Sequence, residues 1–323
     1  MSTAPNDIVL LGAGFSRNWD APLASEIADW LISQVGDDTY LRELLTQPEK
    51  NFEDALSQIQ REDLSSPSSP EAKERLDKLQ TAIAAMFERL NAALERRIGF
   101  DFSQDLRFSV KGFLARFDAI FGLNQDLLLE LHYEDHVLLA NPRRWGGLQK
   151  PGMNELRGPS MPGHKRRWTP APPPFAVHAR LQPYFKMHGS SNWYTNDGRN
   201  LIVMGGKKDL IIRQFDVLLW YYDRFKNYLS RPNTRLMVIG YSFSDQHIND
   251  AIVEAWRNRS LKGIFLVDPA GRGVLKNPTR SLPVSIHNEL EDIRILGVST
   301  RLISATFAGD EFEHQKFIDF FRP

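Results

Sequence analysis

The sequence predicts an α/β fold with a doubly wound, mostly parallel sheet and a helical insertion. Short apolar runs alternate with segments of helical period over much of the 323 residues. Such alternation is typical of a parallel sheet that is covered by helices on both faces. The first apolar run ends in a glycine turn, and the later runs end in polar or glycine-rich residues. These endings are expected where strands deliver side chains to a ligand-binding edge.

The first predicted strand covers residues 8–11, a continuous apolar run that ends in Gly-Ala-Gly. A helix is expected next, with Asp20 as its cap and Pro22 near its first position. One face of this helix is apolar and carries Leu23, Ile27, Leu31 and Val35. A dinucleotide-binding domain of the dehydrogenase type would continue with a strand that ends in an acidic residue. No such strand follows.

Residues 40–98 carry apolar side chains at helical spacing, divided by the Ser/Pro connector SSPSSP at residues 65–70. We expect a helical insertion over residues 40–110, within a single domain that spans residues 1–323. Glu53 and Asp54 are the acidic residues of the insertion that are candidates for reaching a functional site.

The composition changes at residues 141–178, which are rich in Pro and Gly and show little apolar periodicity. Within residues 141–174 there are seven Lys or Arg residues and a single acid, Glu155. A loop of this length is unusual in a compact domain, so it is expected to be functional, mobile or part of an interface. A solvated loop without a partner is the alternative.

Strands and helices alternate elsewhere in the second half of the chain. Strands are predicted at residues 117–123, 184–188, 235–240, 263–268 and 301–306, with a hairpin or two short strands within residues 202–213. Helices are predicted at residues 215–229, 245–258 and 284–295, and from residue 310 onward. This rhythm extends the parallel sheet on which the fold class depends.

The composition excludes several kinds of site. Lys plus Arg and Asp plus Glu number 40 each, so net charge favours neither nucleic acid nor an anionic membrane as a partner. Cysteine is absent, which excludes disulfides, a cysteine nucleophile and thiolate zinc sites, and the eight histidines form no H-x-x-x-H pair. The start, MSTAPND, has no leader pattern, and no apolar run approaches the roughly 20 residues of a membrane helix. A soluble cytoplasmic protein without a metal site is expected.

The ends of five strands are expected to meet at one edge of the sheet, bringing together residues 12–17, 124–126, 188–192, 240–245 and 268–269. Gly12 and Gly14 would let backbone N–H groups approach a pyrophosphate, although they would equally serve a turn that only packs a helix on a strand. Arg17 occupies the third glycine position of the G-x-G-x-x-G fingerprint, and the segment MGGKK lacks the Walker spacing. Any dinucleotide turn here is therefore of another kind.

Asn124, Asp126 and His188 are the polar side chains of this edge with the clearest chemical use. Asn124 and Asp126 would hydrogen-bond ribose hydroxyls or a carboxamide, with a structural turn as the alternative. His188 follows a predicted strand and precedes Gly-Ser-Ser-Asn, which would shape the turn that aims it. A histidine near its ordinary pKa of about 6.5 accepts a proton at neutral pH, while a purely structural histidine is the alternative.

Five motifs in this order, LLGAGFS, LNQD, KMHGSSNW, GYSFSD and FLVDP, resemble the sirtuins. They are most similar to the bacterial sirtuin-like (Sir2-like) branch found in antiphage defence operons. The resemblance implies a Rossmann-like domain, NAD as substrate, and cleavage of the bond between nicotinamide and ribose.

The same resemblance implies roles for residues at the matching positions. His188 would be the base that acts on a ribose hydroxyl, with Asn124 beside the nicotinamide ribose and Asp126 near the carboxamide. The other matching residues would bind the remainder of NAD. Gly12, Ala13, Gly14 and Ser16 would cradle the pyrophosphate, Gly240 and Ser242 would hold the adenosine side, and Asp268 would hold the adenine ribose.

Two departures from the sirtuin pattern favour an NAD glycohydrolase, a defence effector that depletes NAD, over a protein deacylase. Deacylating sirtuins carry a four-cysteine zinc ribbon, and the basic loop at residues 141–178 stands in its place. Their G-I-P-D-F-R segment is here NWDAPLAS, without the Phe-Arg pair. A protein deacylase or ADP-ribosyltransferase and a non-catalytic NAD or ADP-ribose sensor are the alternatives.

A toxic activity needs restraint, and no sensor domain is visible in the sequence. We therefore expect homo-oligomerisation, a partner such as a HerA-type DNA-translocating ATPase, or both. The basic loop additionally predicts contact with nucleic acid or with an acidic face of the partner.

Overall fold

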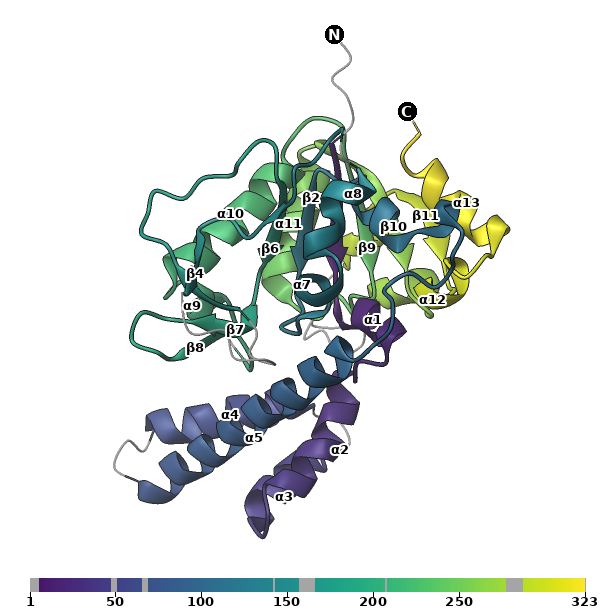
Figure 1. Cartoon of the computed structure of the whole chain (residues 1–323). Helices are drawn as coiled ribbons and strands as arrows, with labels where there is room; N and C mark the ends of the chain where they lie inside the picture. Colours follow the sequence, from purple (N-terminus) through teal and green to yellow (C-terminus); the bar gives the residue numbers. More distant parts are fainter. Residues whose placement is uncertain are drawn as a thin grey trace.

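The computed structural model describes residues 6–47, 51–65, 69–141, 143–156, 166–206, 208–276 and 287–322. At its centre lies a sheet of seven strands in the order β11-β10-β9-β1-β2-β6-β3 (Figure 1). All neighbouring strands run parallel, which confirms the predicted fold class. The strands are β1 (Asn6–Leu11), β2 (Ala119–Gly122), β3 (Leu148–Gln149), β6 (Gln182–Lys186), β9 (Thr234–Ile239), β10 (Leu261–Val267) and β11 (Ile295–Ser299).

The strand order reverses between β1 and β9. The chain first adds β2 and β6 on one side of β1, and then crosses to β9, β10 and β11 on the other side. In open parallel sheets, ligands bind outside the carboxyl ends of the strands at such a reversal. The glycine turn after β1 therefore lies at the place where this topology favours a site.

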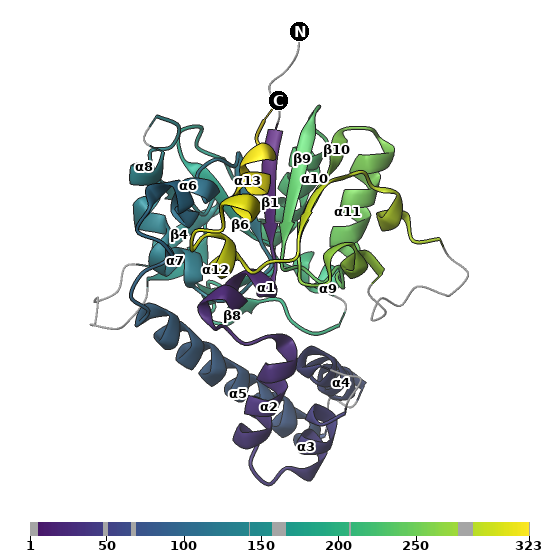
Figure 2. The ribbon, with the colours of Figure 1, turned by 90° about the vertical axis from the view of Figure 1, so that its right-hand side faces the viewer.

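Both faces of the sheet are buried, because consecutive residues of a strand point to opposite sides. Ile8 and Leu10 pack with one group of helices, and Val9 and Leu11 pack with the other. Figure 2 shows these two layers on either side of the sheet. The first layer is α10 (Asp216–Leu229) and α11 (Gln246–Arg257); the second includes α6 (Val110–Leu114), α7 (Leu128–His132), α8 (Val137–Ala140), α12 (Ile303–Thr306) and α13 (Glu311–Asp319).

Four helices form the insertion, which lies beyond the carboxyl edge of the sheet (Figures 1 and 2). They are α2 (Ala24–Gln34), α3 (Thr39–Leu45), α4 (Phe52–Ser65) and α5 (Pro70–Glu95), and they share a hydrophobic cluster of their own. Asp38 caps α3, and Ser69 caps α5 with Pro70 at its start. The insertion was predicted to begin at residue 40. The helix α2 lies before that residue and packs with the other three helices. Residues 66–68 of the predicted connector lie outside the described residues.

A second, smaller sheet has the order β4-β5-β7-β8. Its strands are β4 (Met153–Leu156), β5 (Arg167–Pro170), β7 (Gly189–Tyr194) and β8 (Asn200–Ile202). The structure thus differs from the loop predicted at residues 141–178, where β3, β4 and β5 lie. Strand pairing with distant partners is invisible to local periodicity, which explains the difference. Residues 157–165 of the basic segment lie outside the described part of the chain.

Three shorter predictions were wrong. Residues 209–213 were predicted as a strand, but residues 209–212 belong to α9 (Lys208–Ile212), and residues 301–306 were predicted as a strand but contain α12. The helix predicted at residues 284–295 is, in its described part, a short η5 (Glu289–Asp292) followed by β11. Short apolar runs fit helix and strand equally well, so their period could not decide between the two.

Short helical turns complete the described elements: α1 (Ala13–Ser16), η1 (Arg17–Trp19), η2 (Leu106–Phe108), η3 (Glu134–His136) and η4 (Gly271–Lys276). No helix in the described ranges is long and apolar enough to cross a membrane.

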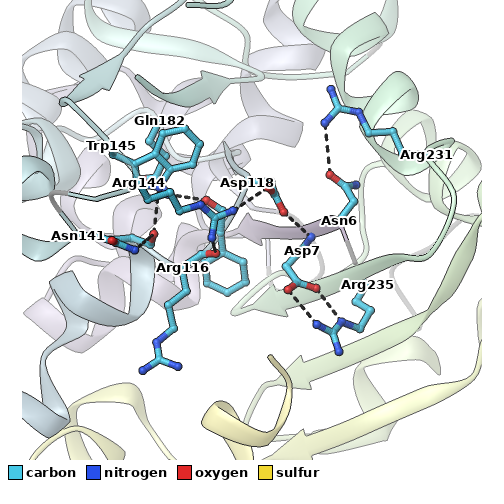
Figure 3. Close-up of polar contacts among 12 residues, drawn as sticks. Asn6, Asp7, Arg116, Asp118, Asn141, Arg144, Trp145, Gln182, Arg231 and Arg235 are labelled. Atoms are coloured by element: carbon cyan, nitrogen blue, oxygen red, sulfur yellow. Dashed lines mark hydrogen bonds and ion pairs between the residues drawn. The ribbon is translucent and has the colours of Figure 1, made fainter. Parts of the chain in front are cut away.

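The amino edge of the sheet is held by an ion-pair network (Figure 3). Arg235 of β9 donates to both carboxylate oxygens of Asp7 on β1, at 2.7 and 2.9 Å. The Asp7 N–H donates to the Asp118 carboxylate at 2.7 Å, and Arg144 donates to the same carboxylate at 2.7 Å. This network ties β9, β1 and the start of β2 together at the end opposite the predicted site.

Candidate active site

The glycine turn after β1 packs directly on the turn after β9. Gly12 N–H donates to the Ile239 carbonyl at 3.0 Å, and Gly14 N–H donates to the Gly240 carbonyl at 2.9 Å. A Cβ on Gly12 would lie 2.5 Å from the Gly240 oxygen, so this position requires glycine. The turn therefore serves close packing, the alternative left open by the sequence. The predicted pyrophosphate contact of Gly12, Ala13 and Gly14 stays a prediction, with Ala13 as the exposed residue of the turn.

Ser16 joins the glycine turn to the end of β2. Its hydroxyl donates to Asp126 Oδ2 at 2.8 Å and accepts from Asn124 Nδ2 at 2.9 Å. Asn124 Nδ2 also donates to the Gly12 carbonyl at 3.0 Å. The structure thus brings together three residues that the sequence placed on two separate strand ends.

Asp126 is buried, and both of its carboxylate oxygens are used within the protein. Oδ2 accepts from Ser16, and Oδ1 accepts from the Leu128 N–H at 3.0 Å. Burial raises the pKa of Asp126 from its ordinary value. This carboxylate orients Ser16, and its predicted contact with a carboxamide remains a prediction.

A buried lysine holds the loop that carries Asp126. Lys186, at the end of β6, donates to the Asp126 carbonyl at 2.5 Å, to Glu130 at 2.8 Å and to Ser190 at 2.7 Å. Asn91 of α5 braces the same loop by accepting from the Leu127 N–H at 3.0 Å and donating to Ser191 at 2.8 Å. The insertion thus contacts the site from outside the sheet.

His188 lies in a two-residue turn between β6 and β7 and is only 1% exposed. The following Gly-Ser-Ser-Asn, expected to shape a turn, begins strand β7 instead. Gly189 has φ +73°, and a Cβ there would lie 2.0 Å from the Leu201 oxygen, so glycine is required beside His188. Burial lowers the pKa of His188 to about 3, well below the value near 6.5 expected from the sequence. His188 is therefore a neutral imidazole at physiological pH.

A second histidine faces the first. His247, in the first turn of α11, places its Nε2 3.4 Å from His188 Nε2. Sequence analysis missed His247, although it lies only two residues beyond the motif GYSFSD. Burial lowers the pKa of His247 as well.

A chain of charges approaches this histidine pair from the insertion. Lys208 of α9 lies 3.0 Å from Asp245 and 2.7 Å from Glu53 of α4. The side chains of Lys208, Asp245 and Glu53 are 15%, 12% and 24% exposed. Of the two acidic candidates in the insertion, Glu53 is therefore the one that reaches the site, whereas Asp54 is exposed. Lys208 is the last residue of the MGGKK segment, which the sequence analysis considered only as a Walker loop and set aside.

The Lys208 ammonium pairs with both Asp245 and Glu53, and the pKa values of these two carboxyl groups shift in opposite directions. Burial would raise the pKa of Asp245, but Lys208 and the two histidines lower it to about 2. Burial raises the pKa of Glu53, an effect that Lys208 only partly offsets. Asp245 is therefore the firmly ionised partner, and Glu53 is the one that gains a proton more readily.

The residues predicted to hold the adenosine side lie across the glycine turn from His188. Gly240 ends β9 with φ +60° and packs on Gly14, and Ser242 is exposed with its hydroxyl 3.0 Å from that of Ser244. Asp268 follows β10, is partly buried, and accepts from the Ala270 N–H at 2.8 Å. Burial raises the pKa of Asp268. These positions are more open to solvent than His188.

Two hollows lie away from the predicted site residues. One of about 350 Å³ is lined by residues of the amino edge such as Arg235 and Arg322, and one of about 680 Å³ lies between the small sheet and the start of α10. No predicted site residue lines either hollow. Among the residues that the structure describes, no group of three or more His, Cys, Asp or Glu could hold a metal ion.

Comparison with known proteins identifies one family. A family model described as a SIR2-like domain matches residues 119–290, just over half of the chain. The match includes Asn124, Asp126, His188 and the positions after β9 and β10, but not the glycine turn after β1. No curated protein matches the chain.

Proposed function

This chain belongs to the SIR2-like family of NAD-dependent proteins, and from this premise we propose that it is an NAD glycohydrolase that releases nicotinamide and ADP-ribose. The observation that carries the proposal is the buried, neutral His188 beside the Ser16–Asn124–Asp126 network. These groups lie at the carboxyl edge, beside the reversal of strand order where a dinucleotide is expected to bind.

The reaction breaks the bond between the nicotinamide nitrogen and the ribose C1′ carbon. Nicotinamide leaves as a neutral molecule with the bonding electron pair, and positive charge develops on the ribose. The oxygen of a water molecule then bonds to C1′, and the water loses a proton. The protein must hold the dinucleotide in place, stabilise the cation and admit one water.

Asn124 suits the stabilising role. Its Nδ2 donates to the Gly12 carbonyl and the Ser16 hydroxyl, and this fixes the side chain in one orientation. Its Oδ1 has no hydrogen-bond partner among the described residues, and Asn124 is only partly buried. A fixed carbonyl oxygen stabilises nearby positive charge without reorganising during the reaction.

His188 suits the role of the base. The lowered pKa keeps the imidazole neutral, with a lone pair that accepts a hydrogen bond from a ribose hydroxyl, and the proton moves to it as positive charge on the ribose makes that hydroxyl more acidic. The absence of cysteine from the whole chain supports hydrolysis over deacylation, since the zinc ribbon that frames an acyl-lysine groove in deacylases requires cysteines.

We further propose that the activity serves antiphage defence and is controlled by a second copy of the chain or by a partner such as a HerA-type ATPase. The burial of His188 supports such control, because NAD must displace covering groups to reach it. Arg166 and Arg167, both exposed, are the described basic residues that would contact nucleic acid or an acidic partner surface.

The test is nicotinamide release from NAD by the wild-type chain, alone and with the candidate partner, compared with His188→Ala and Asn124→Ala. Loss of the base is expected to reduce release by at least about 100-fold. His178→Ala, which changes an exposed histidine, is the matched control and should release nicotinamide at the wild-type rate. Circular dichroism verifies that the variants fold.

Two results would contradict the proposal. Wild-type protein that binds NAD but releases no nicotinamide, with or without the partner, would indicate a sensor. ADP-ribose found on protein instead of free in solution would indicate a transferase.

A further inference from the structure

The orientation of the His188 ring is determined by two neighbours. Its Nε2 faces His247 Nε2 at 3.4 Å, with the ring centroids 5.5 Å apart. The backbone of Leu123, the residue after β2, faces the ring and favours a proton on it. With Nε2 turned toward His247, Nδ1 is the nitrogen that remains for the Leu123 carbonyl. A carbonyl oxygen accepts a hydrogen bond and cannot donate one, so this neighbour favours the tautomer with hydrogen on Nδ1.

His247 is itself held firmly. The Tyr222 hydroxyl donates to its carbonyl at 3.2 Å. In the preceding loop, Phe243 is buried at φ +53°, a conformation that is strained for a residue with a side chain. Asn249 Nδ2 donates to the Phe243 carbonyl at 2.8 Å, and the Asp245 N–H donates to the Tyr241 hydroxyl at 3.1 Å. Strain that is held in this way is typical of functional sites.

We propose that His247 is a positioning residue for NAD cleavage, which donates its Nε2–H to His188 Nε2 and keeps that nitrogen aimed and unprotonated. This inference rests on the proposed function and deepens it. When NAD binds, a ribose hydroxyl takes the place of His247 as the donor to His188 Nε2. The base is thus ready before the substrate arrives.

The charges that face the pair have opposite effects on it. Asp245 raises the pKa of both histidines, and Lys208 lowers both. His247 lowers the pKa of His188, and Asp209 of α9 and Asp250 of α11 raise the pKa of His247. Removing His247 therefore raises the pKa of His188, whereas removing the charge of Asp245 lowers it.

The first measurement uses steady-state nicotinamide release. His247→Ala is expected to lower kcat by 10- to 100-fold while KM changes less than about twofold, because His247 acts through the base. His247→Gln, which keeps a donor, should recover part of this loss. His136→Ala, at an exposed histidine of η3, is the matched control and should not differ from wild type.

The second measurement does not depend on activity. Nitrogen-15 NMR of histidine-labelled, ligand-free protein should show His188 as the Nδ1–H tautomer in the wild-type chain. His247→Ala should mix the tautomers and move the His188 pKa upward, whereas Asp245→Asn should give no upward shift.

The outcomes separate the two proposals. If wild type releases nicotinamide and His247→Ala changes neither kcat nor the His188 tautomer and pKa, the positioning role is wrong and the glycohydrolase stands. If no nicotinamide is released, the NMR result still decides: a changed His188 tautomer supports the role of His247, and an unchanged one overturns it.

Discussion

At the scale of single residues, three glycines determine how closely two loops approach at the centre of the carboxyl edge. Gly12 and Gly14 after β1 lie against Gly240 after β9, and a Cβ on Gly240 would lie 2.3 Å from the Gly14 carbonyl carbon. Backbone atoms cannot move aside as a flexible side chain can. Glycine is needed here for close approach, and at Gly240 also for φ +60°.

Gly240→Ala is expected to lower the free energy of unfolding by about 3 kcal/mol, since it combines a backbone clash with an unfavourable φ. Gly198→Ala is the matched control. Gly198 also has a positive φ, +83°, but a Cβ there would meet nothing within 4 Å. Gly198→Ala should lower the free energy of unfolding by about 1 kcal/mol. Urea denaturation measures the free energy of unfolding of both variants. Equal decreases would show that the close approach of the two loops at Gly240 adds nothing to the cost of the substitution.

At the scale of elements, the insertion is joined to the sheet by a few specific contacts. Lys208 of α9 bridges Glu53 of α4 and Asp245 before α11. Nearby, the Gly206 N–H donates to the Ser57 hydroxyl of α4. On α5, Asn91 contacts Leu127 in the loop after β2 and Ser191 of β7. The helices α4 and α5 of the insertion thereby contact the segments that surround His188.

Lys208→Met should destabilise the protein by roughly 3 kcal/mol at pH 7, because it leaves two largely buried carboxylates without a counter-ion. Each carboxylate would then have a folded-state pKa above its unfolded value. Such a group favours the folded state below the unfolded pKa and disfavours it as pH rises, so the loss should be smaller at pH 5 than at pH 7.

Lys226→Met is the control for this experiment. Lys226 pairs with Glu254 at 3.0 Å, but both side chains are more than a third exposed. Lys226→Met should therefore lower the free energy of unfolding by less than about 1 kcal/mol. Urea denaturation at both pH values tests the pair. If Lys208→Met lowered the free energy of unfolding as little as the control does, the stabilising role of the buried Lys208 bridge would be contradicted.

At the scale of the whole molecule, the buried hydrophobic residues form three clusters. Two lie on opposite faces of the central sheet, and the third lies within the insertion. The sheet clusters share the central strands, whereas the insertion cluster meets the rest of the chain through few side chains, Leu90 of α5 together with Ile202 and Met204. Regions with few shared contacts open independently of the rest of the chain.

Native-state hydrogen exchange should therefore show α2–α5 opening at a lower free energy than β1, β9 and β10. Leu79→Ala, in the buried core of the insertion, should lower the opening free energy of α2–α5 by about 3 kcal/mol and leave the sheet strands little changed. Leu236→Ala, buried on β9, is the complementary variant and should lower the protection of the sheet. Equal effects of both variants on all elements would mean a single cooperative unit.

Sequence reasoning succeeded where a pattern is local and strong. The strand at residues 8–11 and those at 117–123, 184–188, 235–240 and 263–268 are confirmed within a few residues as β1, β2, β6, β9 and β10. The strand predicted at 301–306 failed because Ile303 and Thr306 are buried on a single helical turn, and so short a run has no readable period.

The sequence by itself determined which residues stand at the carboxyl ends of the strands. A strand places its next residues at a known edge, and that relation is local. From this alone Asn124, Asp126 and His188 could be placed near the glycine turn.

Only the tertiary structure decided what these residues touch. The donation of the Gly12 and Gly14 N–H groups to β9, the facing of His188 by His247, and the bridge from Lys208 to Glu53 all join segments far apart in the chain. The lowered pKa of His188 follows from burial by those segments. Burial and proximity depend on how the whole chain packs, and no local pattern contains them.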